Sequence, residues 1–373
     1  MHSNYLFFGI FLLIALSVLF GSHYFVYYSI ISFWRVTSFN AKFILASALC
    51  ALPLSFFIAS FLSRLWENLF TRIFYFFSGL WLGILATLVV AFALGWLIVG
   101  IVKISGNTAN TKTLGTIIFA LVFIYSGYGV WNAYHPKIKN VTFKINNLPE
   151  KWKSKTAVQI SDVHLGHILQ ANFMKGIVEK INFKNPDIVF ITGDLFDGMD
   201  GNLPEIAKPL KDIKASDGMY YVTGNHETYL GVARAFTAVK DTGIKILDDQ
   251  MDTVGEMQIV GISYPERGQS KNVEEILKNM PGFKPSMPSI LLFHSPTQMD
   301  RAKKEGISLQ LSGHTHEGQI FPLRLVTWLI WKGYDYGLYT DGNFSLYTSS
   351  GVGVWGPTMR TGNTPEIVVI KFE

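Results

Sequence analysis

DIVFITGDLFDG, residues 187–198, is the stretch that decides the fold. A short run of β-branched and aromatic residues ends at Gly193, and Asp194 and Asp197 follow immediately. Such a run predicts a buried strand, and the glycine lets the backbone turn sharply and approach a bound ion closely. Polar side chains at the point where a strand ends indicate a site at the edge of a sheet.

The same pattern recurs four more times along the chain. TAVQIS precedes Asp162-Val163-His164, MYYVT precedes Gly224-Asn225-His226-Glu227, SILLF precedes His294, and SLQLS precedes Gly313-His314-Thr315-His316. Because loops at one end of a sheet converge, we expect these carboxylate, amide and imidazole groups to meet in one pocket.

The types of side chain predict the chemistry of that pocket. Mixed Asp, His and Asn ligands suit two divalent ions drawn from Mn, Fe, Zn, Co and Ni. The only cysteine, Cys50, lies far from the motifs, which argues against a closed structural zinc site and excludes an internal disulfide. Two ions roughly 3.5–4 Å apart can share a carboxylate, clamp a phosphate and hold a hydroxide. A two-metal phosphoester hydrolase is therefore the predicted activity.

The ordered motifs resemble the calcineurin-like metallophosphoesterase superfamily, from about Lys155 to the C-terminus. The resemblance implies an α/β sandwich of two mixed sheets flanked by helices. It also implies that His226 faces the substrate as a general acid and that Asp197 hydrogen-bonds His226 to keep it protonated. The implied metal ligands are Asp162, His164 and His316 for one ion, Asn225, His294 and His314 for the other, and Asp194 between the two.

Three further residues have open roles. Glu317 stands where many membrane-linked relatives have glycine, and it either changes access to the metals or faces solvent. His167 is either an ordinary loop histidine or a substrate contact. Arg360 lies in GPTMRTGNTPEIVVI, which resembles the C-terminal part of the membrane-associated branch of the superfamily. Its guanidinium either binds a phosphate in a bidentate manner or makes a structural salt bridge.

The first third of the chain is predicted to be a membrane domain. Four apolar stretches each reach the roughly 20 residues that cross a bilayer, and Tyr and Trp gather at their ends. We place the spans at Tyr5–Tyr28, Phe43–Leu62, Phe74–Val102 and Thr116–Tyr134. The predicted organisation is a four-helix transmembrane domain at 1–135, a linker at 136–154 and a catalytic domain at 155–373.

The charge distribution separates these regions. Residues 1–135 hold six basic residues and one acidic residue, and so carry the whole net charge of +5. The remainder is neutral and has no basic stripe, which argues against a nucleic-acid substrate. Lysines at 137–155 favour a cytoplasmic catalytic domain of a multi-pass bacterial inner-membrane protein, although a domain can be exported largely regardless of its charge. The oligomeric state is left open.

A second apolar segment, FPLRLVTWLIWKGYDYGLY at residues 321–339, follows the last metal motif. Trp328 and Trp331 are candidate substrate contacts, because Trp beside basic residues is typical of a membrane interface. The segment either dips into the bilayer or holds acyl chains, or it packs on the domain core or the transmembrane helices.

These features favour a lipid-linked phosphate substrate, of which UDP-2,3-diacylglucosamine, cleaved by some membrane-linked relatives, is the leading candidate. A polyprenyl or glycerolipid phosphatase is the alternative, and a non-catalytic metal-binding membrane scaffold is the rival from another class.

Overall fold

The computed structural model describes residues 2–199, 201–266 and 268–373. The chain divides into two compact units. A helical unit comprises Met1–Val130 with Pro357–Met359, and a sandwich unit comprises Trp131–Gly356 with Arg360–Glu373.

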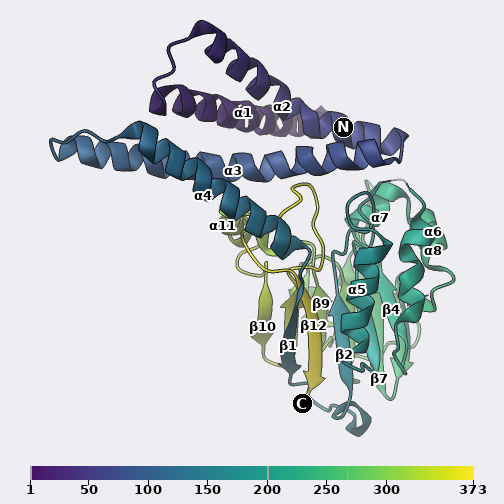
Figure 1. Cartoon of the computed structure of the whole chain (residues 1–373). Coiled ribbons are helices and arrows are strands. Elements are labelled where there is room, and N and C mark those ends of the chain that lie inside the picture. Colours follow the sequence, from purple (N-terminus) through teal and green to yellow (C-terminus); the bar gives the residue numbers. More distant parts are fainter. Residues whose placement is uncertain (1, 200, 267) are drawn as a thin grey trace. The chain divides into compact units, whose positions relative to one another are not determined.

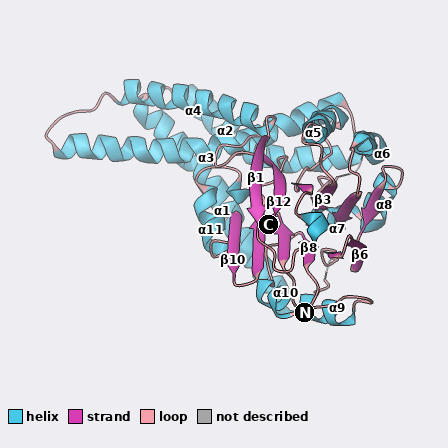
Figure 2. Ribbon diagram, turned by 90° about the horizontal axis from the view of Figure 1, so that it is seen from below, coloured by secondary structure: helices cyan, strands magenta, loops and turns pink. Residues whose placement is uncertain are grey.

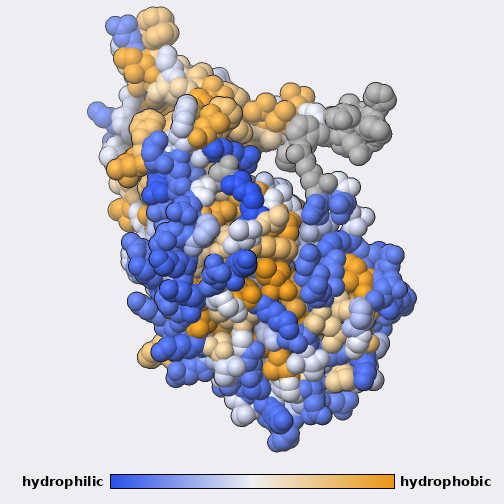
Figure 3. All heavy atoms as spheres, turned by 90° about the vertical axis from the view of Figure 1, so that its right-hand side faces the viewer, coloured by the Kyte–Doolittle hydropathy of each residue, from blue (hydrophilic) through white to orange (hydrophobic). Residues whose placement is uncertain are grey.

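The helical unit holds four long helices, as the sequence predicts (Figure 1). They are α1 (His2–Phe33), α2 (Phe39–Leu65), α3 (Leu69–Ile104) and α4 (Thr111–Ala133). Each is long and apolar enough to cross a membrane. Asn68 begins α3 as an N-cap, since its side chain accepts a hydrogen bond from the Thr71 N–H at 3.0 Å. Hydrophobic colour is concentrated on the helices in the space-filling view, whereas hydrophilic residues are frequent over the sandwich (Figure 3).

The sandwich unit contains two six-stranded sheets, which confirms the expected fold class (Figure 2). The first sheet has the order β1-β12-β2-β3-β4-β5, and β2 to β5 run parallel. Its strands are β1 (Lys137–Phe143), β2 (Thr156–Ile160), β3 (Ile188–Thr192), β4 (Met219–Val222), β5 (Ile244–Ile246) and β12 (Glu366–Phe372).

The second sheet has the order β10-β11-β9-β8-β7-β6. Its four central strands run parallel, and each edge strand is antiparallel to its neighbour. Its strands are β6 (Gln250–Val254), β7 (Met257–Ile262), β8 (Ser289–Phe293), β9 (Leu309–Ser312), β10 (Gly337–Asp341) and β11 (Phe344–Thr348).

Alternation along the strands builds three apolar layers. In β3, Ile188 and Phe190 face the core between the sheets, and Val189 and Ile191 face the outer helices. The first sheet is covered by α5 (Ala171–Asn182), α6 (Leu203–Ala207) and α8 (Val232–Val239). The second is covered by α9 (Val273–Asn279) and α10 (Met299–Lys304). The remaining short helices are η1 (Glu150–Trp152), η2 (Lys208–Asp212), α7 (Asn225–Leu230), η3 (His316–Gly318) and α11 (Leu323–Ile330).

The prediction that residues 136–154 form a linker is corrected by the structure. Its first half forms β1, which pairs in parallel with β12 through all seven residues, from Lys137 to Phe143. Its second half includes Trp152, which is fully buried and donates a hydrogen bond from Nε1 to the Val254 carbonyl at 2.7 Å. The alternating pattern of β1 is hidden in the sequence by lysines, because this edge strand is largely exposed.

Candidate metal centre

The five motifs lie where five parallel strands end. Asp162 follows β2, Asp194 follows β3 and Asn225 follows β4, whereas His294 and His314 follow β8 and β9. Both sheets therefore contribute loops to one edge of the sandwich, which brings the predicted ligands together.

The backbone at this edge is unusual. Five predicted ligands are in the left-handed region, which is sterically costly for any residue with a Cβ. These residues are Asp162 (φ 52°), His164 (φ 51°), Asp194 (φ 48°), His314 (φ 74°) and His316 (φ 50°). Such strain is typical of functional sites, where surrounding contacts hold the chain in place.

Glycines allow the loops to approach one another. A Cβ at Gly313 would lie 2.2 Å from the Asp162 carboxylate, and a Cβ at Gly224 would lie 2.2 Å from that of Asp194. The chain instead uses this space for hydrogen bonds. The N–H of His314 donates to Asp162 at 3.0 Å, and the N–H of His226 donates to Asp194 at 2.8 Å.

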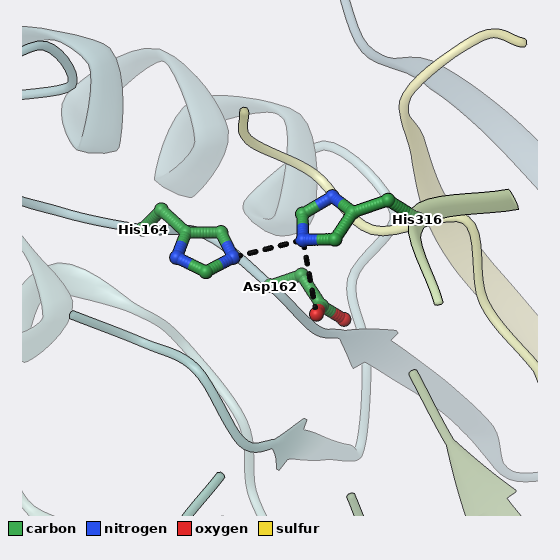
Figure 4. Close-up of side chains that lie close together, drawn as sticks. All are labelled: Asp162, His164 and His316. Atoms are coloured by element: carbon green, nitrogen blue, oxygen red, sulfur yellow. Dashed lines mark hydrogen bonds and ion pairs between the residues drawn. The ribbon is translucent and has the colours of Figure 1, made fainter. Parts of the chain in front are cut away.

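One group of donors consists of Asp162, His164 and His316 (Figure 4). The two imidazole Nε2 atoms are 2.9 Å apart, and His316 Nε2 lies 3.4 Å from an Asp162 carboxylate oxygen. The side chains of Asp162 and His164 are fully buried and that of His316 is 12% exposed, and their donor atoms lie within 4.8 Å of one another.

A second group consists of Asp194, His294 and His314, joined by Asn225. His294 Nε2 lies 3.1 Å from an Asp194 oxygen and 3.2 Å from the Asn225 amide oxygen. His314 Nδ1 lies 2.8 Å from the same amide oxygen. Asp194 is 3.9 Å from His164 Nε2 on the other side, so its carboxylate lies between the two groups.

These donors fit two divalent ions. His294 donates from Nδ1 to the Thr192 carbonyl at 2.8 Å, an arrangement that leaves Nε2 to face the site as a ligand atom. Several nitrogen and oxygen lone pairs then converge within hydrogen-bonding distance, and a single proton can bridge only two of these atoms at a time. A metal ion satisfies the whole set, and the all-oxygen-and-nitrogen composition suits Mn, Fe, Co, Ni or Zn.

The electrostatics of the cluster favour cation binding. Burial would raise the pKa of Asp194, but the facing imidazoles of His294 and His226 outweigh it and hold the pKa well below its usual range. Burial would lower the pKa of His294, but the Asp194 carboxylate raises it to about 10. Burial and the neighbouring His294 lower the pKa of His314 to about 4. A buried carboxylate thus keeps its charge beside imidazoles that can exchange a proton for a metal ion.

His226 reaches the same cluster but is held differently. Its ring lies 4.6 Å from that of His164, and its Nδ1 donates to the main-chain carbonyl of Asp197 at 2.7 Å. The predicted partner of His226, the Asp197 carboxylate, is thus replaced by the main-chain carbonyl of the same residue. That carboxylate accepts from the N–H groups of His167 at 3.1 Å and Met199 at 2.9 Å, and so it shapes the loop that presents the carbonyl.

Arg360 forms no ion pair with a carboxylate among the described residues, and its guanidinium is turned into the protein. Its guanidinium is fully buried and donates to the carbonyls of Gly353 and Ser350 and to the Asn363 side chain. Nη2 also lies 3.0 Å from His316 Nδ1. The hydrogen-bonding capacity of Arg360 is therefore spent on the protein, where it orders the C-terminal loop and supports a predicted ligand.

The structure also places the other two residues whose roles the sequence leaves open. His167 is buried, and its main-chain N–H donates to the Asp197 carboxylate at 3.1 Å. Glu317 does not face solvent. It is buried, and its backbone is in the left-handed region. Its carboxylate pairs with Arg324 at 2.7 Å, which ties the loop after β9 to the start of α11. Burial raises the pKa of Glu317 to about 7 despite Arg324.

Glu227 is a supporting residue to which sequence reasoning gave no role. Its fully buried carboxylate accepts from the N–H groups of Asp194 at 3.0 Å, Phe196 at 3.0 Å and Gly224 at 2.6 Å. It therefore fixes the loops after β3 and β4 together. Burial and the nearby Asp194 raise its pKa to about 7. Its position directly after Gly224-Asn225-His226 was the only signal available in the sequence.

Aromatic side chains surround the donors, and most were missed in the sequence. Tyr229 and Trp355 lie beside His226, with ring centroids at 5.2 Å and 5.1 Å. Tyr264 and the predicted contact Trp331 lie beside His314, at 5.9 Å and 5.4 Å. Trp328, the other predicted contact, is exposed on α11.

Comparisons with known proteins agree with this geometry. A family model described as calcineurin-like phosphoesterase matches residues 155–318. A protein of Campylobacter jejuni named as an uncharacterized metallophosphoesterase is 34% identical over 264 residues, which cover 70% of this chain and 69% of that protein. The chain belongs to the calcineurin-like metallophosphoesterase family. It is accordingly a metal-dependent phosphoesterase, and the family uses dinuclear metal centres.

Relatives also combine this domain with membrane segments. A Danio rerio protein named transmembrane protein with metallophosphoesterase domain is 32% identical over 289 residues, covering 72% of this chain and 64% of that protein. Among solved structures, a dimetal phosphatase from Danio rerio is 13% identical, with a TM-score of 0.35, over 53% of this chain and 87% of that one.

Asp194→Ala is expected to abolish binding of both metal ions, because one carboxylate lies between the two donor groups. Metal content of the purified protein, measured by plasma mass spectrometry, should fall from close to two ions to close to none. Asp212→Ala, which removes an exposed carboxylate, is the control and should keep both ions. Retention of normal metal content by Asp194→Ala would contradict the bridging assignment.

Proposed function

We propose that the protein hydrolyses an amphiphilic phosphoester at a dinuclear centre formed by Asp162, His164, Asp194, Asn225, His294, His314 and His316. The observation that carries the amphiphilic substrate is the exposure of α11, which begins a few residues after His316. None of the eight residues of α11 is buried, although most are apolar.

The contacts of α11 support a role at the site. Trp328 is 56% exposed and Leu329 is 67% exposed, values that are unfavourable in water for such large apolar groups. Trp331, which ends the helix, reaches back to within 5.4 Å of the His314 ring. An apolar surface is thus continuous with a predicted metal ligand, which suits a substrate with a phosphate head and an apolar tail.

The protein residues have separable roles in hydrolysis. Bound metal ions would supply the charge that holds the phosphate and a hydroxide at neutral pH. His226, held through Nδ1 by the Asp197 carbonyl, turns its other nitrogen toward the cluster and can donate a proton to the leaving oxygen. Arg360 fixes the orientation of His316, and Glu227 keeps the loops of Asp194 and Asn225 in register.

Within this class, UDP-2,3-diacylglucosamine is our leading substrate, and polyprenyl or glycerolipid phosphates are the alternatives. All present a phosphoester or pyrophosphate beside long acyl or prenyl chains. We further propose a multi-pass location in a bacterial inner membrane with the sandwich unit on the cytoplasmic side, in accordance with the lysines at 137–155.

His226→Ala is expected to retain both metal ions and to lower turnover by roughly 10²–10⁴-fold, because the residue acts as an acid and not as a ligand. Steady-state rates and metal content should be measured on the same metal-loaded preparation. The loss should be smaller for 4-nitrophenyl phosphate, whose leaving group needs little protonation.

The exposed His135 provides a matched control, since His135→Ala should alter neither quantity. Loss of metal from His226→Ala would show that His226 is a ligand. A wild-type protein that binds two ions but hydrolyses no phosphoester would instead support the non-catalytic scaffold.

Replacing Leu325, Trp328 and Leu329 with Ser is expected to weaken turnover of a lipid phosphate and spare 4-nitrophenyl phosphate. These residues share one helical face, and the contact of Trp331 with His314 is left intact. Loss of a few hundred Å² of apolar contact at about 25 cal/mol per Å² would cost several kcal/mol of lipid binding.

The assay should compare kcat/KM for both substrates in detergent micelles, with Phe183→Ser as a control that removes an exposed aromatic residue at the end of α5. Equal loss on both substrates would indicate a structural role for α11. No loss on either would remove the lipid contact.

A further inference from the structure

Two aromatic side chains, those of Tyr229 and Trp355, lie beside His226. The Tyr229 ring lies 5.2 Å from the His226 ring at an interplanar angle of 63°, and the Trp355 ring lies at 5.1 Å and 73°. Tyr229 is 59% exposed and Trp355 is 48% exposed. Two large aromatic groups, each about half exposed, therefore lie beside the residue that we propose as the acid.

The position of Trp355 is fixed by a hydrogen-bonded clamp. The buried side chain of Gln319 accepts a hydrogen bond from the main-chain N–H of Trp355 at 3.2 Å and donates one to its main-chain carbonyl at 3.1 Å. Gln319 lies three residues after His316, so the loop that follows β9 and carries this predicted ligand also holds Trp355. The main chain at Trp355 is thus held in advance while about half of the residue stays exposed, which reduces the entropy lost when a ligand binds.

Tyr229 is fixed by a different element. It lies on α7, which also carries Asn225 and His226, one helical turn after them. The backbone of Tyr229 is therefore held one turn from that of His226, and its ring lies beside the imidazole. Two independent elements, α7 and the loop at Trp355, thus place aromatic faces around one imidazole.

The chemistry of hydrolysis gives these faces a ligand. The oxygen of a water molecule forms the new P–O bond and its proton passes to solvent. The P–O bond to the leaving group breaks, and the leaving oxygen keeps the electron pair and takes the proton of His226, which solvent then replaces. The atoms attached to that oxygen must then lie next to His226, where Tyr229 and Trp355 are. Aromatic faces bind flat or apolar rings in stacked or edge-to-face geometry.

We propose that Tyr229 and Trp355 form a leaving-group subsite that selects an alcohol or phosphate bearing a ring with a flat, apolar face. The assignment rests on the proposed function, because it uses His226 as the acid. It adds that the leaving group, and not only the apolar tail near α11, is recognised by the protein.

The first test compares two substrates that differ in the leaving group, 2-naphthyl phosphate and glycerol 2-phosphate. For Trp355→Ala, kcat/KM with the naphthyl ester should fall roughly 10-fold, mainly through KM, and with the glycerol ester less than about 2-fold. Tyr229→Ala should show the same selectivity, and Trp355→Phe should recover most of the loss. Phe183→Ala, another exposed aromatic residue, should change neither value.

A second test does not depend on turnover. Calorimetry on the metal-loaded protein should show that a naphthyl phosphonate binds more tightly than methylphosphonate, and that Trp355→Ala removes most of the difference with the metal content unchanged. Equal loss on both substrates, or an unchanged preference for the naphthyl phosphonate, would overturn the subsite. Ring-selective binding by a metal-loaded wild-type protein that hydrolyses neither these esters nor a lipid phosphate would support the subsite and contradict the proposed function.

Discussion

The convergence of buried carboxylate, amide and imidazole groups from five loops is the constraint on which the sandwich unit depends. Asp194 illustrates it, since its carboxylate lies 3.1 Å from His294 and 3.9 Å from His164, which follow strands of different sheets. Five of the converging residues have left-handed backbone, at a cost of about 1–2 kcal/mol each. Metal binding offsets such a cost, because an ion replaces repulsive contacts between facing lone pairs with coordinate bonds.

The surrounding protein supports the loops in this geometry through its own hydrogen bonds. Glu227 ties the loops after β3 and β4 through three N–H donors, and the N–H of His314 reaches Asp162 from the opposite sheet. Arg360 supports His316 from the C-terminal loop. The two sheets are thus joined at their functional edge by polar contacts, and between them by an apolar core that includes Phe190 and Leu292. This division leaves the chemistry at one edge and most of the stability in the middle.

The sequence predicted the strands that lead to the site and the convergence of the polar residues that follow them, because each motif is local. A β-rich run followed by Gly193 and Asp194 carries both its secondary structure and its chemistry within a few residues. The four long helices were equally local, since length and apolar composition are sufficient to predict them. Contacts that join distant residues were not predictable in this way. The Asp197 carbonyl, the carbonyl partners of Arg360 and the pairing of β1 with β12 all depend on tertiary structure. Trp355 gave no signal, because its proximity to His226 arises only when the C-terminal loop folds back.

The most direct test of the dinuclear centre is X-ray absorption spectroscopy at the metal edge on the manganese-loaded, full-length protein, combined with anomalous diffraction from its crystals. We predict two metal positions roughly 3.5–4 Å apart with Asp194 between them. One should be bound by Asp162, His164 and His316, and the other by Asn225, His294 and His314. A single metal position, or ions bound away from Asp194, would contradict the account.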